Sequence, residues 1–132
     1  MALALALGVG FLGAGTAAAA PVVTTLPERP DSGGTTQFTD TPSLADARTQ
    51  TIESWSRPLD ADAITVHFTT GLPACHAVHA EVQETPDIVA VKLRSGTPPQ
   101  SEGRVCAMIG VVGSLEVPLG APVGDRAVVS IT

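Results

Sequence analysis

The sequence predicts an all-β domain, a small antiparallel sandwich or barrel closed by one disulfide, within a chain of 132 residues. Three observations support this fold class. Apolar and polar residues alternate with a period of two over most of residues 48–132. Turn-forming residues separate these runs at intervals of about 8 to 12 residues, as in sandwiches and barrels. The chain contains two cysteines, Cys75 and Cys106.

The N-terminal residues 1–20 are expected to be an export signal. An apolar run is followed by small residues, and the three alanines at 18–20 fit a signal-peptidase site. Cleavage there would leave a mature chain that begins near Pro21. The basic segment that normally precedes the apolar run is missing, so we expect the true translation start upstream of Met1. The alternative is an uncleaved membrane anchor over residues 2–20, a length at the lower limit for spanning a bilayer.

Residues 21–47 are predicted to be a disordered linker. They are rich in proline, threonine, serine and glycine and contain few large apolar side chains. Such a segment buries too little apolar surface to offset the conformational entropy lost on ordering. We therefore expect an extended tether between the cell envelope and the domain. The alternative is a long arm that docks on the domain.

The β domain is expected to span residues 48–132. Its alternating runs predict strands within the ranges 51–57, 64–68, 78–82, 89–93, 105–111, 115–119 and 127–131. Residues 74–82 also fit one face of a helix, so a short helix there is an alternative. Pro122 and Gly124 predict a hairpin turn before the last run, because proline suits the first corner of a turn and glycine adopts positive φ.

Cys75 and Cys106 are expected to form a disulfide, because exported proteins fold in an oxidising environment. A loop of about 31 residues corresponds to roughly 3 to 4 kcal/mol of stabilisation in the chain-entropy model. The alternative is a zinc site in which His76 and His79 join the two thiolates. Adjacent residues such as Cys75 and His76 rarely ligate one ion together, and no second Cys or His pair has a zinc spacing. We therefore expect no metal and no cofactor.

The sequence predicts no catalytic residues, and the expectation is that the protein is not an enzyme. It contains no seryl turn, phosphate loop, EF-hand loop or zinc-protease motif. Two carboxylate pairs, Asp60 with Asp62 and Glu81 with Glu84, are interpreted as solvated charges. Glu84 is instead expected to form an ion pair with Arg126 that fixes a turn to the last strands. The functional alternative for Arg126 is a surface contact with an anion.

Charge and composition narrow the possible partners. Seven basic and 13 acidic residues give a net charge of −6 at pH 7. Nucleic acids and anionic lipids require a basic surface, so neither is expected as a partner, and no membrane contact is expected beyond the signal. The abundance of alanine, glycine, valine, proline and arginine is typical of GC-rich genomes and indicates an actinobacterial source.

Residues 60–132 carry a recurring spacing of residues. The pattern consists, in chain order, of Cys75, Glu84-Thr85, Val89-x-Val91, Cys106 and Val117-x-Leu119-x-x-Pro122-x-Gly124-Asp125-Arg126. This pattern resembles uncharacterised secreted or lipid-anchored actinobacterial proteins. The resemblance implies an extracytoplasmic domain with one disulfide and a closing hairpin, and it carries no known activity. The lipid-anchored members have a lipobox cysteine after their apolar segment, which this chain lacks.

The leading functional hypothesis is an exported, non-catalytic binding module that acts on an unknown partner in the cell envelope or extracellular space. A second hypothesis is a small secreted inhibitor of a protease or another hydrolase. It requires a rigid protruding loop, for which residues 95–100 are the candidate. A third is an envelope hydrolase, which requires a cleft with two carboxylates at catalytic separation.

Overall fold

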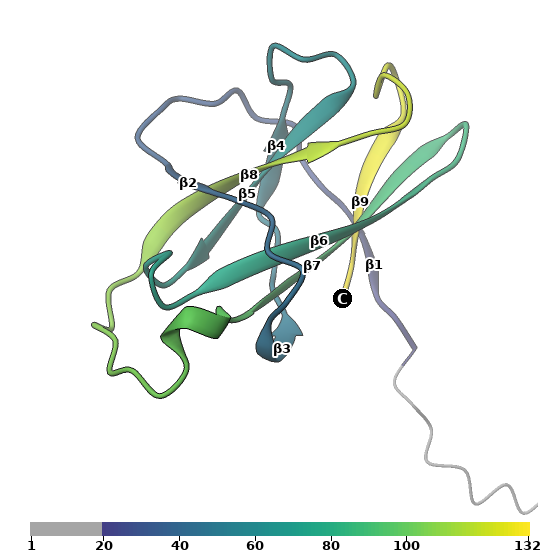
Figure 1. The fold of residues 1–132 in the computed structure, drawn as a ribbon. Helices are drawn as coiled ribbons and strands as arrows, with labels where there is room; N and C mark the ends of the chain where they lie inside the picture. Colours follow the sequence, from purple (N-terminus) through teal and green to yellow (C-terminus); the bar gives the residue numbers. More distant parts are fainter. Residues whose placement is uncertain (1–19) are drawn as a thin grey trace, which may run out of the picture.

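The computed structural model describes residues 20–132, so the expected signal at 1–20 lies outside the described residues except for Ala20. The described chain is nearly all-β, as predicted, with nine strands and one short 3-10 helix (Figure 1). The elements are β1 Val23–Thr25, β2 Thr36–Phe38, β3 Ala45–Thr49, β4 Ser54–Ser56, β5 Ala63–Thr70, β6 Ala77–Glu84, β7 Ile88–Thr97, η1 Pro99–Ser101, β8 Val111–Pro118 and β9 Ala127–Ile131.

The strands form two sheets. The four-stranded sheet has the order β2-β8-β5-β4, and the five-stranded sheet is built around β7. Strand β6 pairs along one edge of β7, whereas β9 and β3 pair with the two ends of its other edge. The β2–β8 and β7–β9 pairs are parallel. The sheets are therefore mixed but mainly antiparallel, as predicted, because the other five strand pairs are antiparallel.

The core lies between the two sheets. On β5, the side chains of Ile64, Val66 and Phe68 are each 0% exposed, and they alternate with polar residues on the other face. The Phe38 ring on β2 packs edge-to-face against Phe68, with ring centroids 5.2 Å apart. Gly113 on β8 lies beside both rings, and a Cβ there would come within 2.7 Å of each. The two aromatic rings therefore need a glycine at this position.

Residues 21–47, called the arm below, are not a disordered linker. They contain β1, β2 and most of β3, and the domain therefore extends well before residue 48. Each of these strands pairs with a strand from later in the chain, and this supplies backbone hydrogen bonds that a local analysis of composition cannot detect. Leu26 and Phe38 are the apolar side chains of the arm that enter the core, each 5% exposed. The docked arm is thus the interpretation that the structure supports.

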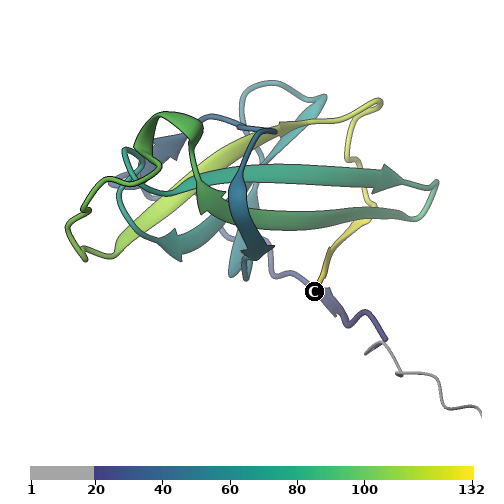
Figure 2. The same ribbon diagram turned by 60° about the horizontal axis from the view of Figure 1, so that its bottom comes forward.

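The arm closes both seams between the sheets. On one side, β1 pairs with β9, and the next residues pair with β4 of the other sheet, where Arg29 donates to the Trp55 carbonyl at 2.8 Å. On the other side, β2 pairs with β8, and Thr41 then donates to the Val78 carbonyl of β6 at 2.8 Å. Strands that cross between sheets at corners are typical of barrel-like sandwiches. Figures 1 and 2 show the arm running along the outside of the strands.

Two further expectations are corrected, and the strand predicted at 78–82 is confirmed over its helical alternative. Residues 105–110 form no strand, and β8 begins only at Val111. Residues 74–82 form no helix, because β6 pairs along its whole length with β7. Strands β8 and β9 form no closing hairpin, since they belong to different sheets, although Gly124 does adopt the expected positive φ of 53°. Among residues 20–132, no helix has the length and apolar character needed to cross a membrane.

Candidate functional site

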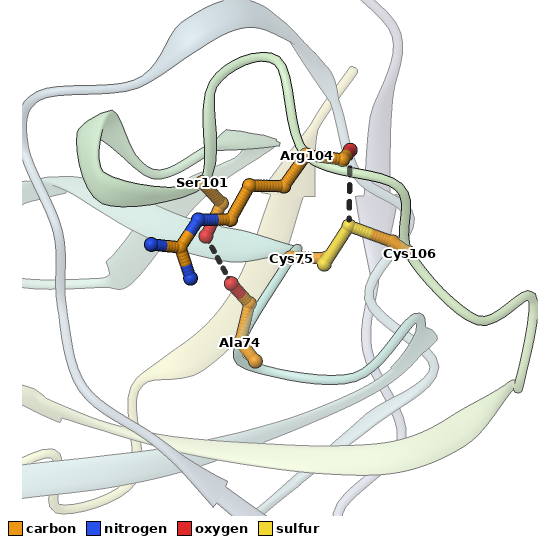
Figure 3. The surroundings of a disulfide bond; sticks show 5 residues. All are labelled: Ala74, Cys75, Ser101, Arg104 and Cys106. Carbon is orange, nitrogen blue, oxygen red and sulfur yellow. Dashed lines mark hydrogen bonds between the residues drawn. A yellow bond between two sulfur atoms is a disulfide. The ribbon is translucent and has the colours of Figure 1, made fainter.

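The disulfide anchors a long loop to the body of the domain. Cys75 and Cys106 are bonded as predicted, with Cα atoms 6.0 Å apart (Figure 3). The bond joins the turn before β6 to the segment between η1 and β8. The Ser101 hydroxyl also donates to the Ala74 carbonyl, beside Cys75. The segment is therefore fixed at its start and at its middle.

Residues 102–110, called the interaction loop below, lie at one end of the molecule beyond the strands (Figures 1 and 2). The side chains of Val105 and Met108 are fully exposed, at 101% and 102%, and Ile109 is 54% exposed. Arg104 is exposed as well. Buried apolar side chains are the rule in a folded domain, and a group of exposed ones marks a surface that can bind a partner. This loop is the candidate functional site.

Local backbone features explain why the apolar residues of this loop do not form a strand. Gly103 has a φ of 76°, a conformation that favours glycine and turns the chain directly before Arg104. The Ile109 N–H donates to the Ala107 carbonyl at 3.0 Å, which makes a tight turn. The alternation at 105–111 indicated a strand because a pattern of apolar and polar residues does not reveal the turns at Gly103 and at residues 107–109.

The loop at residues 95–100, predicted as a protruding inhibitory loop, does not protrude. Ser95, Gly96 and Thr97 are the end of β7, paired with β6 on one edge and β3 on the other. Ser95 is only 9% exposed. The exposed segment lies after η1 instead. Nothing in the sequence indicated this exposed segment, because apolar residues such as Val105 and Met108 are usually buried.

The alternative zinc ligands do not come together as a set. Both thiols are consumed by the disulfide. His79 directs Nδ1 toward the Asp40 carboxylate at 3.0 Å, while His76 lines a cleft of about 220 Å³ near Pro73. Within the part of the chain that the structure describes, no group of three or more His, Cys, Asp or Glu residues is placed to hold a metal ion.

The carboxylate pairs noted in the sequence have separate structural partners. The Asp60 carboxylate accepts the Asp62 backbone N–H at 2.9 Å within a turn. Glu81 lies 3.8 Å from Arg94 on the neighbouring strand. Glu84 accepts the Gly120 N–H at 2.7 Å. The carboxylates of Glu81 and Glu84 thus have different partners, whereas Asp60 bonds to the backbone of its own pair member.

The predicted ion pair between Glu84 and Arg126 is present at 3.1 Å. The Arg126 side chain is only 12% exposed and also donates to four backbone carbonyls, those of Thr85, Ala121, Pro122 and Val123. These five bonds use all five N–H groups of the guanidinium. No donor is left for an external anion, so the contact fixes the turns that flank β9.

The Gly120 N–H lowers the pKa of Glu84 most, opposed by desolvation, and the Arg126 guanidinium lowers it further. The net result is a pKa below the ordinary value of 4.5. The carboxylate is therefore held in its charged form by the fold.

A buried serine–histidine contact was not found from the sequence. Ser56 Oγ lies 2.8 Å from His67 Nε2, and the two residues are 3% and 8% exposed. His67 points to the outer face of its sheet, but residues of the arm between 29 and 35 cover it and leave a cleft of about 180 Å³. Ser56 does not line this cleft. The spacing of Ser54 and Ser56 on one strand face was the only available signal.

Comparisons with known proteins add no identification. The chain matches no protein-family model, and no curated protein or solved structure matches it. The resemblance to secreted actinobacterial proteins therefore stays a prediction.

Proposed function

We propose that this protein is an exported, non-catalytic interaction module that binds a partner in the cell envelope or extracellular space through the interaction loop. The observation that carries the proposal is the exposure of Val105, Met108 and Ile109 on a segment fixed by a disulfide. Export is supported by the disulfide, which persists in oxidising compartments, and by the expected signal at residues 1–20.

The loop has the properties of a pre-organised binding element. A large apolar side chain that is solvent-exposed in the free protein gains free energy when a partner buries it. A disulfide lowers the conformational entropy that the loop loses on binding, and this raises affinity without any new contact. Arg104 adds a cation beside the apolar residues, and arginine is enriched in the parts of interfaces that dominate affinity.

The test uses a double variant, Met108→Ser with Ile109→Ser, and a matched control, Leu59→Ser. Leu59 is 108% exposed on a different loop, so its replacement removes exposed apolar surface away from the interaction loop. Immobilised wild-type protein is incubated with culture fluid and envelope extract of the source organism. We expect a partner captured by the wild type and by the Leu59→Ser control to be lost with the double variant. Equal capture by all three proteins would contradict the proposal.

The second candidate function is inhibition of a secreted hydrolase, with the interaction loop in place of residues 95–100. The exposure of Arg104 on a disulfide-anchored loop favours this possibility, because such a segment can enter a protease cleft. Fluorogenic assays of several protease classes at micromolar protein distinguish the two functions. Inhibition that is lost with Arg104→Ala supports the inhibitor, and cleavage after Arg104 without inhibition contradicts it.

A further inference from the structure

The seam between β6 and β8 is closed by the arm over only part of its length. The arm pairs with β8 as far as Leu115 and then bridges to β6 at Val78. Beyond this crossing lies a groove of about 300 Å³ between the two strands, called the open seam below. Its lining residues are Asp40, Ala80, Val82, Leu115, Glu116, Val117 and Pro118. The floor is apolar and reaches the core, since Leu115 and Val117 are 2% and 3% exposed.

The open seam has a defined length. At one end, the Asp40 carboxylate accepts the Ala80 N–H at 2.8 Å and so covers the edge of β6. At the other end, the Glu84 carboxylate accepts the Gly120 N–H at 2.7 Å, across from β6 to the segment after β8. Between these closures, β6 advances by four residues, or about 13 Å at the rise of an extended chain. This space suits a short extended segment of a few residues.

The backbone of β6 presents unpaired hydrogen-bonding groups to the open seam. The Val78 carbonyl and the Ala80 N–H both bond to the arm, so even-numbered residues of β6 direct their polar groups away from β7. By the same alternation, the N–H and carbonyl of Val82 point into the open seam. Among the described residues, neither of these two groups has a backbone partner across the seam. An unpaired strand edge of this kind is a template for another strand.

The charge of the rim indicates which segment fits. The lining residues include two carboxylates, Asp40 and Glu116, and no basic side chain. The protein as a whole carries a net charge of −6, which opposes docking of a second copy on this acidic rim. A basic segment is attracted by both the rim and the whole molecule.

We propose that the open seam binds an extended, basic peptide segment of a partner protein by β-strand addition. The segment pairs with the edge of β6 at Val82 through backbone hydrogen bonds. One of its apolar side chains packs on Leu115 and Val117, and flanking lysine or arginine side chains lie near Asp40 and Glu116. This site is separate from the interaction loop and does not depend on the function proposed for that loop.

The experiment is a titration of the labelled protein with the capped pentapeptide lysine-valine-threonine-valine-lysine, followed by NMR. We expect saturable shifts centred on the amides of Ala80, Val82 and Glu116. Two matched peptides serve as controls, one with both lysines replaced by glutamate and one with N-methylated central amides. Both should bind at least about threefold more weakly than the basic peptide. The glutamate peptide lacks the charge contact, and the N-methylated peptide lacks the backbone N–H groups that would pair with β6.

Two protein variants locate the charge contact. Glu116→Lys should weaken binding of the basic peptide about threefold to fivefold, whereas Asp87→Lys, with the same charge change outside the open seam, should not. Val82→Pro removes the N–H that faces the seam while leaving the β7 side of the strand intact, and should weaken binding about twofold to tenfold. Thermal melts establish that each variant is folded.

Three results would overturn the proposal: shifts that spread over the surface without saturation, equal binding of the N-methylated peptide, or concentration-dependent dimers that occupy the seam. The peptide controls need no change in the protein, so they decide the question even where a variant fails to fold.

Discussion

The arm is polar in composition and lies against the core, whereas the interaction loop is rich in apolar side chains and lies in solvent. Phe38 of the arm is 5% exposed, and Met108 of the loop is 102% exposed. The difference arises from what the backbone of each segment can pair with. The arm finds strand partners in both sheets, while the loop is separated from the sheets by a disulfide and by tight turns. Backbone pairing thus decides which of the two segments is docked on the sheets, and within the docked arm the apolar side chains of Leu26 and Phe38 are the ones that enter the core.

The largest expected effect comes from removing the anchor of the arm. Phe38→Ala should lower the free energy of unfolding by about 3–5 kcal/mol, because it leaves a cavity beside Phe68 and Gly113 in the core. Met108→Ala is the matched change in the interaction loop and should alter stability by no more than about 0.5 kcal/mol. Urea denaturation followed by Trp55 fluorescence measures both. Similar losses of unfolding free energy for the two variants would contradict the claim that the arm contributes to the core and the loop does not.

The second effect concerns the covalent anchor. Cys75→Ala should lower the free energy of unfolding by roughly 3 to 4 kcal/mol, because the bond closes a loop with a sequence separation of 31 residues. Cys106→Ala and the double variant should give the same loss. Hydrogen exchange should rise first in residues 102–110, while the amide of Leu26, bonded to the Val128 carbonyl, stays protected. Simultaneous loss of protection in the arm would show that the two regions are coupled.

The smallest effect is on the contacts of Glu84 at the end of β6, whose contribution to the free energy of unfolding depends on pH. The folded-state pKa of Glu84 is depressed, so its stabilising contribution is present above about pH 4.5, its ordinary value, and is lost as pH falls through the folded value. Glu84→Gln should be less stable than wild type at pH 7, and the difference should vanish below the folded pKa. Denaturation midpoints at stepwise lower pH measure this convergence. A constant difference down to pH 3 would exclude ionisation of Glu84 as the cause.

The parts of the fold that the sequence predicted are those set by local alternation. Ile64, Val66 and Phe68 alternate with polar residues and form the buried face of β5. The disulfide was predictable because the chain contains two cysteines, which have one possible pairing within the chain. The ion pair of Glu84 with Arg126 followed from complementary charges in two turn regions.

The arm and the candidate sites were not predictable in this way. Strand β2 has three residues and pairs in parallel with β8, more than 70 positions later, a separation beyond any periodicity argument. Val105 and Ile109 alternate like a buried strand, and only the three-dimensional path of the chain shows that they are exposed. The open seam exists because the arm crosses from β8 to β6 at Asp40. Nothing in the sequence around Asp40 predicts this crossing.

The pairing of β1 with β9 constrains the order in which the molecule can assemble. Val22 and Thr132 exchange two backbone hydrogen bonds of 2.9 Å, so the first strand has no partner until residues near 132 have emerged. Because strand pairs such as β1 with β9 and β2 with β8 join parts of the chain that are far apart in sequence, the rate of folding is dominated by slow, non-local closure. A chain that is threaded through a membrane from its N-terminus would stay open throughout its passage. The arm can close the two seams only after the last strand has arrived.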